Sequence, residues 1–273
     1  MTKCHTLSLL VLLLAVFSCK PAGQGGSLSE YGSHSEATQF ALFEQYVQKL
    51  LAAEPQRALQ MQDSVIAEAL SDSTKWAQLT KLEDKFIMDP NSPYRSEELY
   101  LPVAEAILKS DLSSEELIAR AGWVLPKLKL NRPGEPAADF EFITPKGRRS
   151  SLYQTIDSHN PKQTILFFSN PGCPNCKEIT EALSRDLRVE ALIAKGDLLV
   201  VNIYPDEDVQ AWLDYLPNYP ASWVCGQDED QILNSYTIYW LRAIPSLYLL
   251  DKEKRVILKD APLERLLPAI SNQ

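Results

Sequence analysis

Cys173 and Cys176 stand two residues apart, where the chain passes from an apolar run into a helical segment. The run QTILFF, residues 163–168, is short and continuous, as expected for a strand buried in the centre of a sheet. A helix is predicted to begin near Pro174 and to run to Gly196, a residue that commonly ends helices. A cysteine pair in this position could be a redox centre, half of a metal site or a structural disulfide.

Strand and helix patterns alternate on both sides of this pair, through residues 131–273. A Pro- and Gly-rich stretch opens the region, DFEFIT alternates like a strand, and a helix is predicted to start near Ser150 or Ser151. Beyond the cysteines lie a second buried strand, DLLVVNIY, a helix, DEDVQAWLDYL, two strands, PSLYLLD and RVILKD, and a closing helix, PLERLLPAI. This order predicts an α/β sandwich closed by a terminal hairpin.

The same order of elements resembles the thioredoxin fold. The segment LRAIPSLYLLD is similar to the thioredoxin segment around the cis-proline, and it places Ile244 and Pro245 in that loop. The lead-in GEPAADFEFITPKGRRSSL resembles the opening of the TlpA/ResA and peroxiredoxin-related branch. The resemblance covers residues 131–273 and implies a thioredoxin-like sandwich that exchanges thiols and disulfides as an oxidoreductase.

The position of the cysteines suggests their roles. Cys173 precedes the predicted helix start, where free backbone N–H groups and the positive end of the helix dipole stabilise a thiolate. Cys173 is therefore the expected nucleophile, and Cys176, one turn into the helix, would resolve the mixed disulfide. The resemblance further implies that Pro174 and Asn175 tune the redox potential, and that a cis Ile244–Pro245 bond faces the cysteines and pairs with an extended substrate. No cofactor beyond the cysteine pair is expected.

Three positions depart from the patterns of the resembled families. Phe167 stands where thioredoxins carry a buried aspartate, and Gly172 stands where a tryptophan often precedes the first cysteine. Ile179 occupies the position of a glutamate that is frequent in the TlpA/ResA branch, and Glu178 lies one position early. Glu178 is either a substitute proton acceptor or an ordinary solvated side chain, so the proton acceptor is left unassigned.

Other site chemistries fit the region less well. A peroxiredoxin would need a Pro-x-x-x-Thr-x-x-Cys loop, but Leu166 and Asn170 occupy the Pro and Thr positions. A zinc site needs about four ligands, and His159 and Cys225 are the only further soft candidates in this region, so no metal is expected. A structural disulfide is the third alternative. A disulfide that closes so small a loop would restrict the unfolded chain little, so stability alone is a poor reason for it. Cys225 is either a lone, partly buried small residue or a third thiol that trades disulfides with the pair.

The preceding residues, 36–130, predict an all-α domain. Apolar residues recur there at spacings of three and four, as in amphipathic helices. One helix is predicted to open with Ser92 as its N-cap and Pro93 in its first turn, and Pro102 is expected to break or kink it. Another should begin with a capping box of Ser113 and Glu116. The combination resembles Bacteroides-type lipoproteins, whose N-terminal helical domain has no assigned function.

The N-terminus predicts export. Residues 1–18 read as a signal peptide with the apolar stretch LSLLVLLLAVF, and the sequence VFSCK resembles a lipobox in which Cys19 is lipidated. A plain signal peptide with an incidental cysteine is the alternative. Residues 19–35, rich in Gly and Ser, would be a flexible tether. The tether begins with KPAGQGG, which lacks acidic residues, and this favours the periplasmic side of a bacterial membrane.

These features define the expected partners. Protein disulfides or thiols would be substrates, an upstream redox protein would exchange electrons with the pair, and the lipid would hold the chain at a membrane. A net charge of −9 argues against nucleic acid, whose phosphates require a basic surface. The alternative function is that of a binding lipoprotein, in which the helical domain engages a partner and the thioredoxin-like domain is mainly a docking surface.

Overall fold

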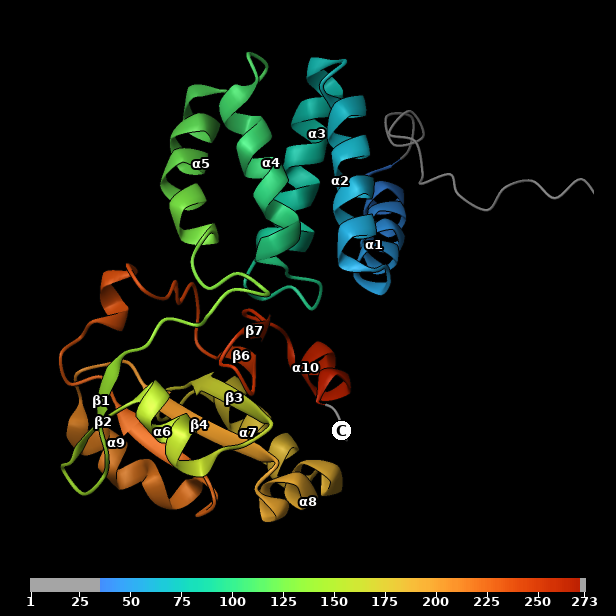
Figure 1. The fold of residues 1–273 in the computed structure, drawn as a ribbon. Helices are drawn as coiled ribbons and strands as arrows, with labels where there is room; N and C mark the ends of the chain where they lie inside the picture. The colour runs from blue at the N-terminus through green and yellow to red at the C-terminus, as the bar shows by residue number, and fades with distance from the viewer. Residues whose placement is uncertain (1–34, 271–273) are drawn as a thin grey trace, which may run out of the picture.

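A computed structural model describes residues 35–270 (Figure 1). A group of helices lies on one side, and a mixed sheet flanked by helices lies on the other. The predicted signal peptide, Cys19 and nearly all of the predicted tether lie outside the described residues. Within residues 35–270, no helix is both long and apolar enough to cross a bilayer.

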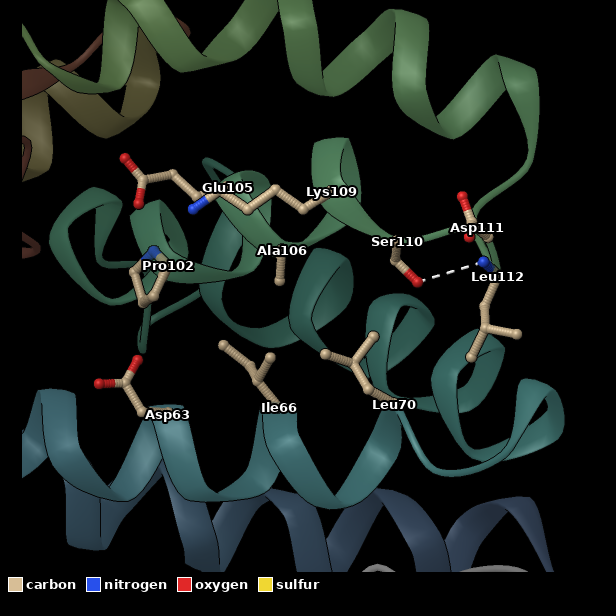
Figure 2. A pocket seen from close by; sticks show the side chains of 10 residues that line it. All are labelled: Asp63, Ile66, Leu70, Pro102, Glu105, Ala106, Lys109, Ser110, Asp111 and Leu112. Carbon is tan, nitrogen blue, oxygen red and sulfur yellow. Dashed lines mark hydrogen bonds between the residues drawn. The ribbon is translucent and has the colours of Figure 1, made fainter.

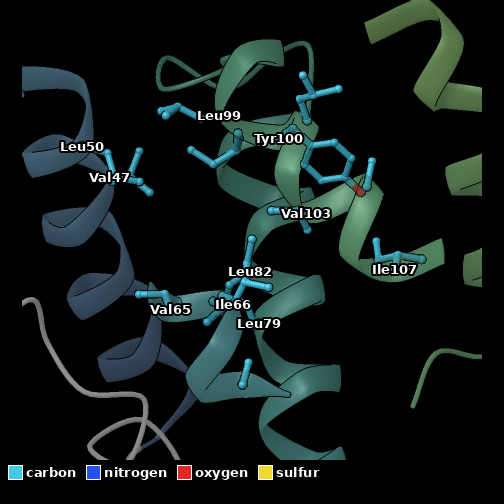
Figure 3. Close-up of a cluster of buried hydrophobic side chains, with 14 of the residues drawn as sticks. Val47, Leu50, Val65, Ile66, Leu79, Leu82, Leu99, Tyr100, Val103 and Ile107 are labelled. Atoms are coloured by element: carbon cyan, nitrogen blue, oxygen red, sulfur yellow. The ribbon is translucent and has the colours of Figure 1, made fainter. Parts of the chain in front are cut away.

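The helical domain packs its helices around one apolar core (Figure 3). Gln62 lies inside this core, where it accepts a hydrogen bond from Tyr46 Oη at 3.0 Å and donates one to Glu83 at 2.6 Å. Such pairing is required because an unpaired amide is costly inside an apolar core. The helices are α1 (Glu36–Ala52), α2 (Pro55–Ala69), α3 (Ser73–Glu83), the π-helix η2 (Asp84–Met88), α4 (Glu97–Lys109) and α5 (Glu115–Leu128).

Two local predictions in this domain are wrong in detail. Helix α4 begins at Glu97 because Ser96, not Ser92, accepts the backbone N–H of Leu99. Helix α5 has Ser114 as its N-cap, one residue later than predicted. Both errors concern which of several nearby serines caps the helix. Pro102 was expected to break or kink its helix, and it lies within α4 without ending it.

The second domain contains a seven-stranded sheet with the order β2-β1-β5-β4-β3-β6-β7. β3 pairs in parallel with β4 and antiparallel with β6, and β6 and β7 form the predicted terminal hairpin. The strands are β1 (Glu141–Ile143), β2 (Arg149–Ser151), β3 (Gln163–Phe168), β4 (Leu198–Tyr204), β5 (Val224–Gln227), β6 (Ser246–Asp251) and β7 (Val256–Leu258). The helices are α6 (Leu152–His159), α7 (Pro174–Arg185), α8 (Leu187–Lys195), α9 (Val209–Tyr215), α10 (Leu263–Ala269) and the 3-10 turns η3 (Leu216–Asn218) and η4 (Leu233–Ser235).

Alternation along β3 distributes its side chains to two cores. Ile165 and Phe167 pack in a core with residues of α7, α8 and α10, whereas Leu166 and Phe168 pack in the opposite core with residues of α6. Successive side chains of a strand point to opposite faces, so a strand covered on both faces must be apolar throughout. The continuous run QTILFF is therefore the central strand of an α/β sandwich, as predicted.

Two features of the sheet domain differ from the sequence prediction. The single helix predicted up to Gly196 is two helices, because Asp186 ends α7 and caps α8 by accepting the backbone N–H groups of Arg188 and Val189. The short strands β2 and β5 were not predicted. β5 is a four-residue strand that pairs in parallel with β4 and meets β1 through one residue pair, Ile143 with Gln227.

Buried charges join the two domains. Glu97 at the start of α4 pairs with Lys259 Nζ at 2.7 Å and with Arg242 Nε at 3.1 Å. Asp260 pairs with Arg242 at 2.6 Å and lies 3.9 Å from Arg95. All five side chains are at most 11% exposed, so solvent screens their interactions weakly. We call these five residues the interdomain charge cluster.

Candidate functional site

The candidate site lies at the start of α7, immediately after the central strand. Cys173 and Cys176 form a disulfide whose Cα atoms are 5.2 Å apart. Cys173 is the N-cap of α7, and its Sγ accepts the backbone N–H of Cys176 at 3.2 Å. Cys173 is partly exposed and Cys176 is buried. A nucleophile must reach its substrate, and of the two sulfurs the one of Cys173 is the more accessible.

The Ile244–Pro245 peptide bond is cis, as the sequence predicts, and it lies beside the disulfide. The Ile244 carbonyl oxygen is 3.9 Å from Cys173 Sγ. In the described part of the chain, the backbone N–H of Ile244 has no hydrogen-bond partner. A neighbouring extended chain could therefore pair with this backbone.

Buried polar contacts hold the loop that carries the disulfide. Ser169, directly after β3, accepts a hydrogen bond from Asn202 Nδ2 at 2.6 Å and lies 2.9 Å from Tyr219 Oη. The next residue, Asn170, donates to the carboxylate of Asp206. Burial raises the pKa of Tyr219 to about 12, so its hydroxyl stays protonated near neutral pH. The loop therefore leaves the sheet at a position fixed by neutral hydrogen bonds and one carboxylate.

The structure shows where the residues lie that depart from the thioredoxin and TlpA/ResA patterns. Phe167 is fully buried in the same core as Cys176 and packs edge-on against Trp223, so no carboxylate lies at that position. Ile179 packs against this core from α7, and Glu178 is exposed. Pro174 and Asn175 form the exposed first turn of α7.

A groove of about 360 Å³ runs past the cis-proline. Asn175, Ile244 and Pro245 line it on the thioredoxin-like side. On its other side lie Pro90, Asn91 and Arg95, which all belong to the helical domain. No sequence pattern places these helical-domain residues near the cysteines, so they were not among the predicted site residues.

The remaining cysteine and histidine candidates lie elsewhere. Cys225 is a free, partly buried thiol on β5, and burial raises its pKa to about 12. His159 ends α6 and contacts the carbonyl of Thr155 at 2.8 Å. Among residues 35–270, no group of three or more His, Cys, Asp or Glu side chains is arranged to hold a metal ion.

A larger cavity, of about 610 Å³, lies within the helical domain (Figure 2). Ile66 of α2 and Leu70, which directly follows α2, face Pro102 and Ala106 of α4 across it. The side chains that line it contain no cysteine. The groove at Pro245 is thus the better candidate for a site linked to the disulfide.

The fold and this site define a thioredoxin-like protein, and a solved structure shows the family. The chain is 35% identical to a thioredoxin-like protein from Bacteroides caccae, with a TM-score of 0.77, and the match covers 87% of this chain and 84% of that one. This chain belongs to the thioredoxin-like proteins. The similarity spans both domains, so the helical domain is part of the shared architecture.

Other comparisons match one domain each. Residues 28–121 match the family described as "Domain of unknown function (DUF5106)". The C-terminal domain of an uncharacterized protein from Bacteroides fragilis is 38% identical, with a TM-score of 0.47, over 50% of this chain and 94% of that one. The thioredoxin domain of a thiol-disulfide oxidoreductase from Bacteroides vulgatus is 20% identical, with a TM-score of 0.43, over 51% of this chain and 95% of that one. No curated protein matches this chain.

Proposed function

We propose that this protein is an exported, membrane-tethered thiol–disulfide oxidoreductase that works through the Cys173–Cys176 pair. One observation carries the proposal: a disulfide at the start of α7 joins a partly exposed cysteine to a buried one, beside the Ile244 carbonyl. Membership of the thioredoxin-like proteins supports it. We expect the pair to reduce disulfides of partner proteins.

The proposed reaction begins with the reduced pair. The Cys173 thiolate attacks one sulfur of a substrate disulfide, forms a mixed disulfide and releases the other substrate sulfur as a thiolate. The Cys176 thiolate then attacks the Cys173 sulfur and releases the second substrate sulfur. Two electrons pass to the substrate, the two thiol protons end on the released thiols through solvent, and the Cys173–Cys176 disulfide remains.

The N-terminus of α7 lowers the free energy of forming the Cys173 thiolate. The backbone N–H of Cys176 already points at Cys173 Sγ, and the positive end of the α7 dipole adds to its effect. Ile244 and Pro245 would bind an extended substrate next to the sulfur, and Pro174 and Asn175 would tune the potential. No cofactor is needed in this reaction, and an upstream redox protein would return the electrons.

Membrane attachment is the second part of the proposal. We place the lipid on Cys19 and the protein on the periplasmic side of a bacterial membrane, because a lipobox-like sequence is followed by a tether without acidic residues at its start. Labelling cells with a clickable fatty acid tests this. The wild-type chain should carry label and Cys19→Ala should not, whereas label in both would contradict attachment at Cys19.

Trapping the mixed disulfide tests the redox chemistry. The Cys176→Ser variant should accumulate a covalent adduct with a cystine peptide, because the resolving thiol is gone, and dithiothreitol should release it. Cys173→Ser should form no such adduct. If the two variants trap equally, the assigned roles are wrong. If Cys173→Ser supports the biological role of the wild-type chain, the alternative of a binding lipoprotein replaces this proposal.

A further inference from the structure

The groove at the cis-proline is shared by both domains. Asn175 and Ile179 of α7 and the Ile244–Pro245 pair line it from the thioredoxin-like domain. Pro90 and Asn91 line it from the helical domain, in the turn between η2 and α4. A chain that lies along the groove would therefore contact residues of both domains, and it would pass Ile244, whose carbonyl oxygen is 3.9 Å from Cys173 Sγ.

The helical-domain side of the groove has a fixed shape. The backbone N–H of Asn91 donates to Asp89 Oδ1 at 2.8 Å, and Ser92 Oγ donates to the carbonyl of Phe86 at 2.6 Å. Arg95 donates to the carbonyl of Ser92 at 3.3 Å and, across the domain boundary, to the carbonyl of Asp260 at 3.1 Å. We call residues 89–95 the groove turn. Its internal bonds and its anchor on Asp260 hold it against the thioredoxin-like domain.

The thioredoxin-like side of the groove is tied to the same segment. Arg242, two residues before Ile244, donates to the carbonyl of Met88, which ends η2. Asp260 binds Arg242 at 2.6 Å and accepts a hydrogen bond from Ser246 at 2.9 Å. The residues on either side of Ile244–Pro245 are thus fixed directly, or through Asp260, to the helical domain.

The chemistry of the groove indicates what fits it. The Ile244 backbone N–H is free to pair with an extended chain, and apolar side chains lie beside it. Glu178 and Glu264 bring exposed carboxylates, whereas the Arg95 guanidinium is buried and already bound to Asp260. The groove therefore has an excess of negative charge at its surface, which suits a basic residue.

The geometry points to the groove turn as the part of the site that selects substrates, with Asn91 as a specificity-determining residue. The occupant is an extended polypeptide segment that flanks the substrate disulfide and carries a basic residue. This inference rests on the proposed exchange at Cys173. It gives the helical domain a direct role, because a polypeptide that fills the groove would contact Asn91, whereas a small disulfide at the sulfur need not fill the groove.

Filling the groove in the full chain tests this selection. Asn91→Trp should lower kcat/KM for a lysine-flanked cystine peptide about tenfold, equivalent to about 1.4 kcal/mol. It should leave the rate with bis(2-hydroxyethyl) disulfide unchanged. Asn218→Trp, which alters an exposed asparagine outside the groove lining, is the matched control and should change neither rate.

The outcomes separate the two proposals. An unchanged peptide rate in Asn91→Trp, or an equal loss with both disulfides, would overturn the selection by the groove turn. A wild-type chain that reduces neither disulfide would overturn the exchange function itself, and the inference with it. If only the peptide rate falls, the groove turn selects the substrate.

The charge of the occupant has its own test. The wild-type chain should prefer a lysine-flanked peptide over a glutamate-flanked one, and Glu178→Gln with Glu264→Gln should reduce that preference several-fold. The preference should also weaken as salt increases, because both carboxylates are exposed. Equal rates for the two peptides in the wild type would overturn the basic character of the occupant.

Discussion

Arg242 and Glu97 form an ion pair at 3.1 Å that joins the cis-proline loop to the first turn of α4. Both side chains are at most 5% exposed, and Lys259 pairs with the same carboxylate at 2.7 Å. A buried pair is costly to break because its partners stay buried without compensation. The helical domain is thus bound to the loop that lies beside the disulfide.

We predict that Glu97→Gln destabilises the protein by about 3 kcal/mol, because it leaves two buried cations facing a neutral amide. Urea unfolding measures this change. Glu36→Gln is the matched control, since the Glu36–Lys81 pair at 2.8 Å is largely exposed and should contribute little. Equal stability of wild type and Glu97→Gln would mean that the interdomain charge cluster does not stabilise the fold.

Glu83 makes stability depend on pH. Burial raises its pKa to about 8 from an ordinary value of 4.5, although Gln62 donates a hydrogen bond to it. The folded state therefore binds a proton that the unfolded state has released between these two values. Stability should fall as pH rises from 4.5 towards 8, by at most about 1.4 kcal/mol per pH unit, and level off above.

The Glu83→Gln variant checks that assignment. It keeps the hydrogen-bonding shape without the titration, so urea unfolding should show a much weaker loss of stability between pH 4.5 and 8. An unchanged slope in Glu83→Gln would show that another group titrates.

Gly226 on β5 leaves room for a neighbouring ring. A Cβ at this position would lie 2.9 Å from Cε2 of Phe142 and closer still to Cδ2. Gly226→Ala should therefore destabilise the protein by about 2 kcal/mol through overpacking. Gly122→Ala, in the exposed face of α5, meets nothing nearer than 3.9 Å and should stabilise by up to about 1 kcal/mol. Thermal unfolding of the two variants should shift in opposite directions, and a parallel shift would contradict the packing argument.

Cys225 should be a spectator in the exchange. Its pKa is raised to about 12 by burial, so it is almost entirely a thiol near neutral pH. In the reduced protein, iodoacetamide should modify Cys173 much faster than Cys225, as measured by peptide mass spectrometry. Cys225→Ser should keep the wild-type exchange rate. A large loss of rate in Cys225→Ser would instead make Cys225 a third thiol that trades disulfides with the Cys173–Cys176 pair.

The central sheet and the cysteine helix were predictable because local sequence determines them. QTILFF is apolar at every position, as a strand covered on both faces must be, and Pro174 suits the first turn of a helix. β5 was missed because its four residues are only partly apolar, and they become a strand only by pairing with β4. Such pairing depends on residues distant in the sequence.

The candidate site also combines residues that the sequence identifies with residues that only the folded structure brings together. The cysteines and Ile244–Pro245 carry a recognisable pattern, whereas Asn91 and Arg95 have no local sign of a role in the groove. They reach it only because Glu97, Arg242 and Asp260 bring the domains together. The pairs that cross the domain boundary, Glu97–Arg242 and Arg95–Asp260, join positions more than a hundred residues apart, so periodicity and motif spacing cannot reveal them.

The redox activity of the Cys173–Cys176 pair can be measured by equilibrating the pair with dithiothreitol or glutathione and then trapping thiols in a Cys225→Ser background. We expect reversible two-electron exchange while circular dichroism shows a folded chain. A potential near that of thioredoxin, about −270 mV, is expected for a reductant, and one near about −120 mV would mark an oxidant. A disulfide that is reduced only when the protein unfolds would rule out an oxidoreductase that works through this pair.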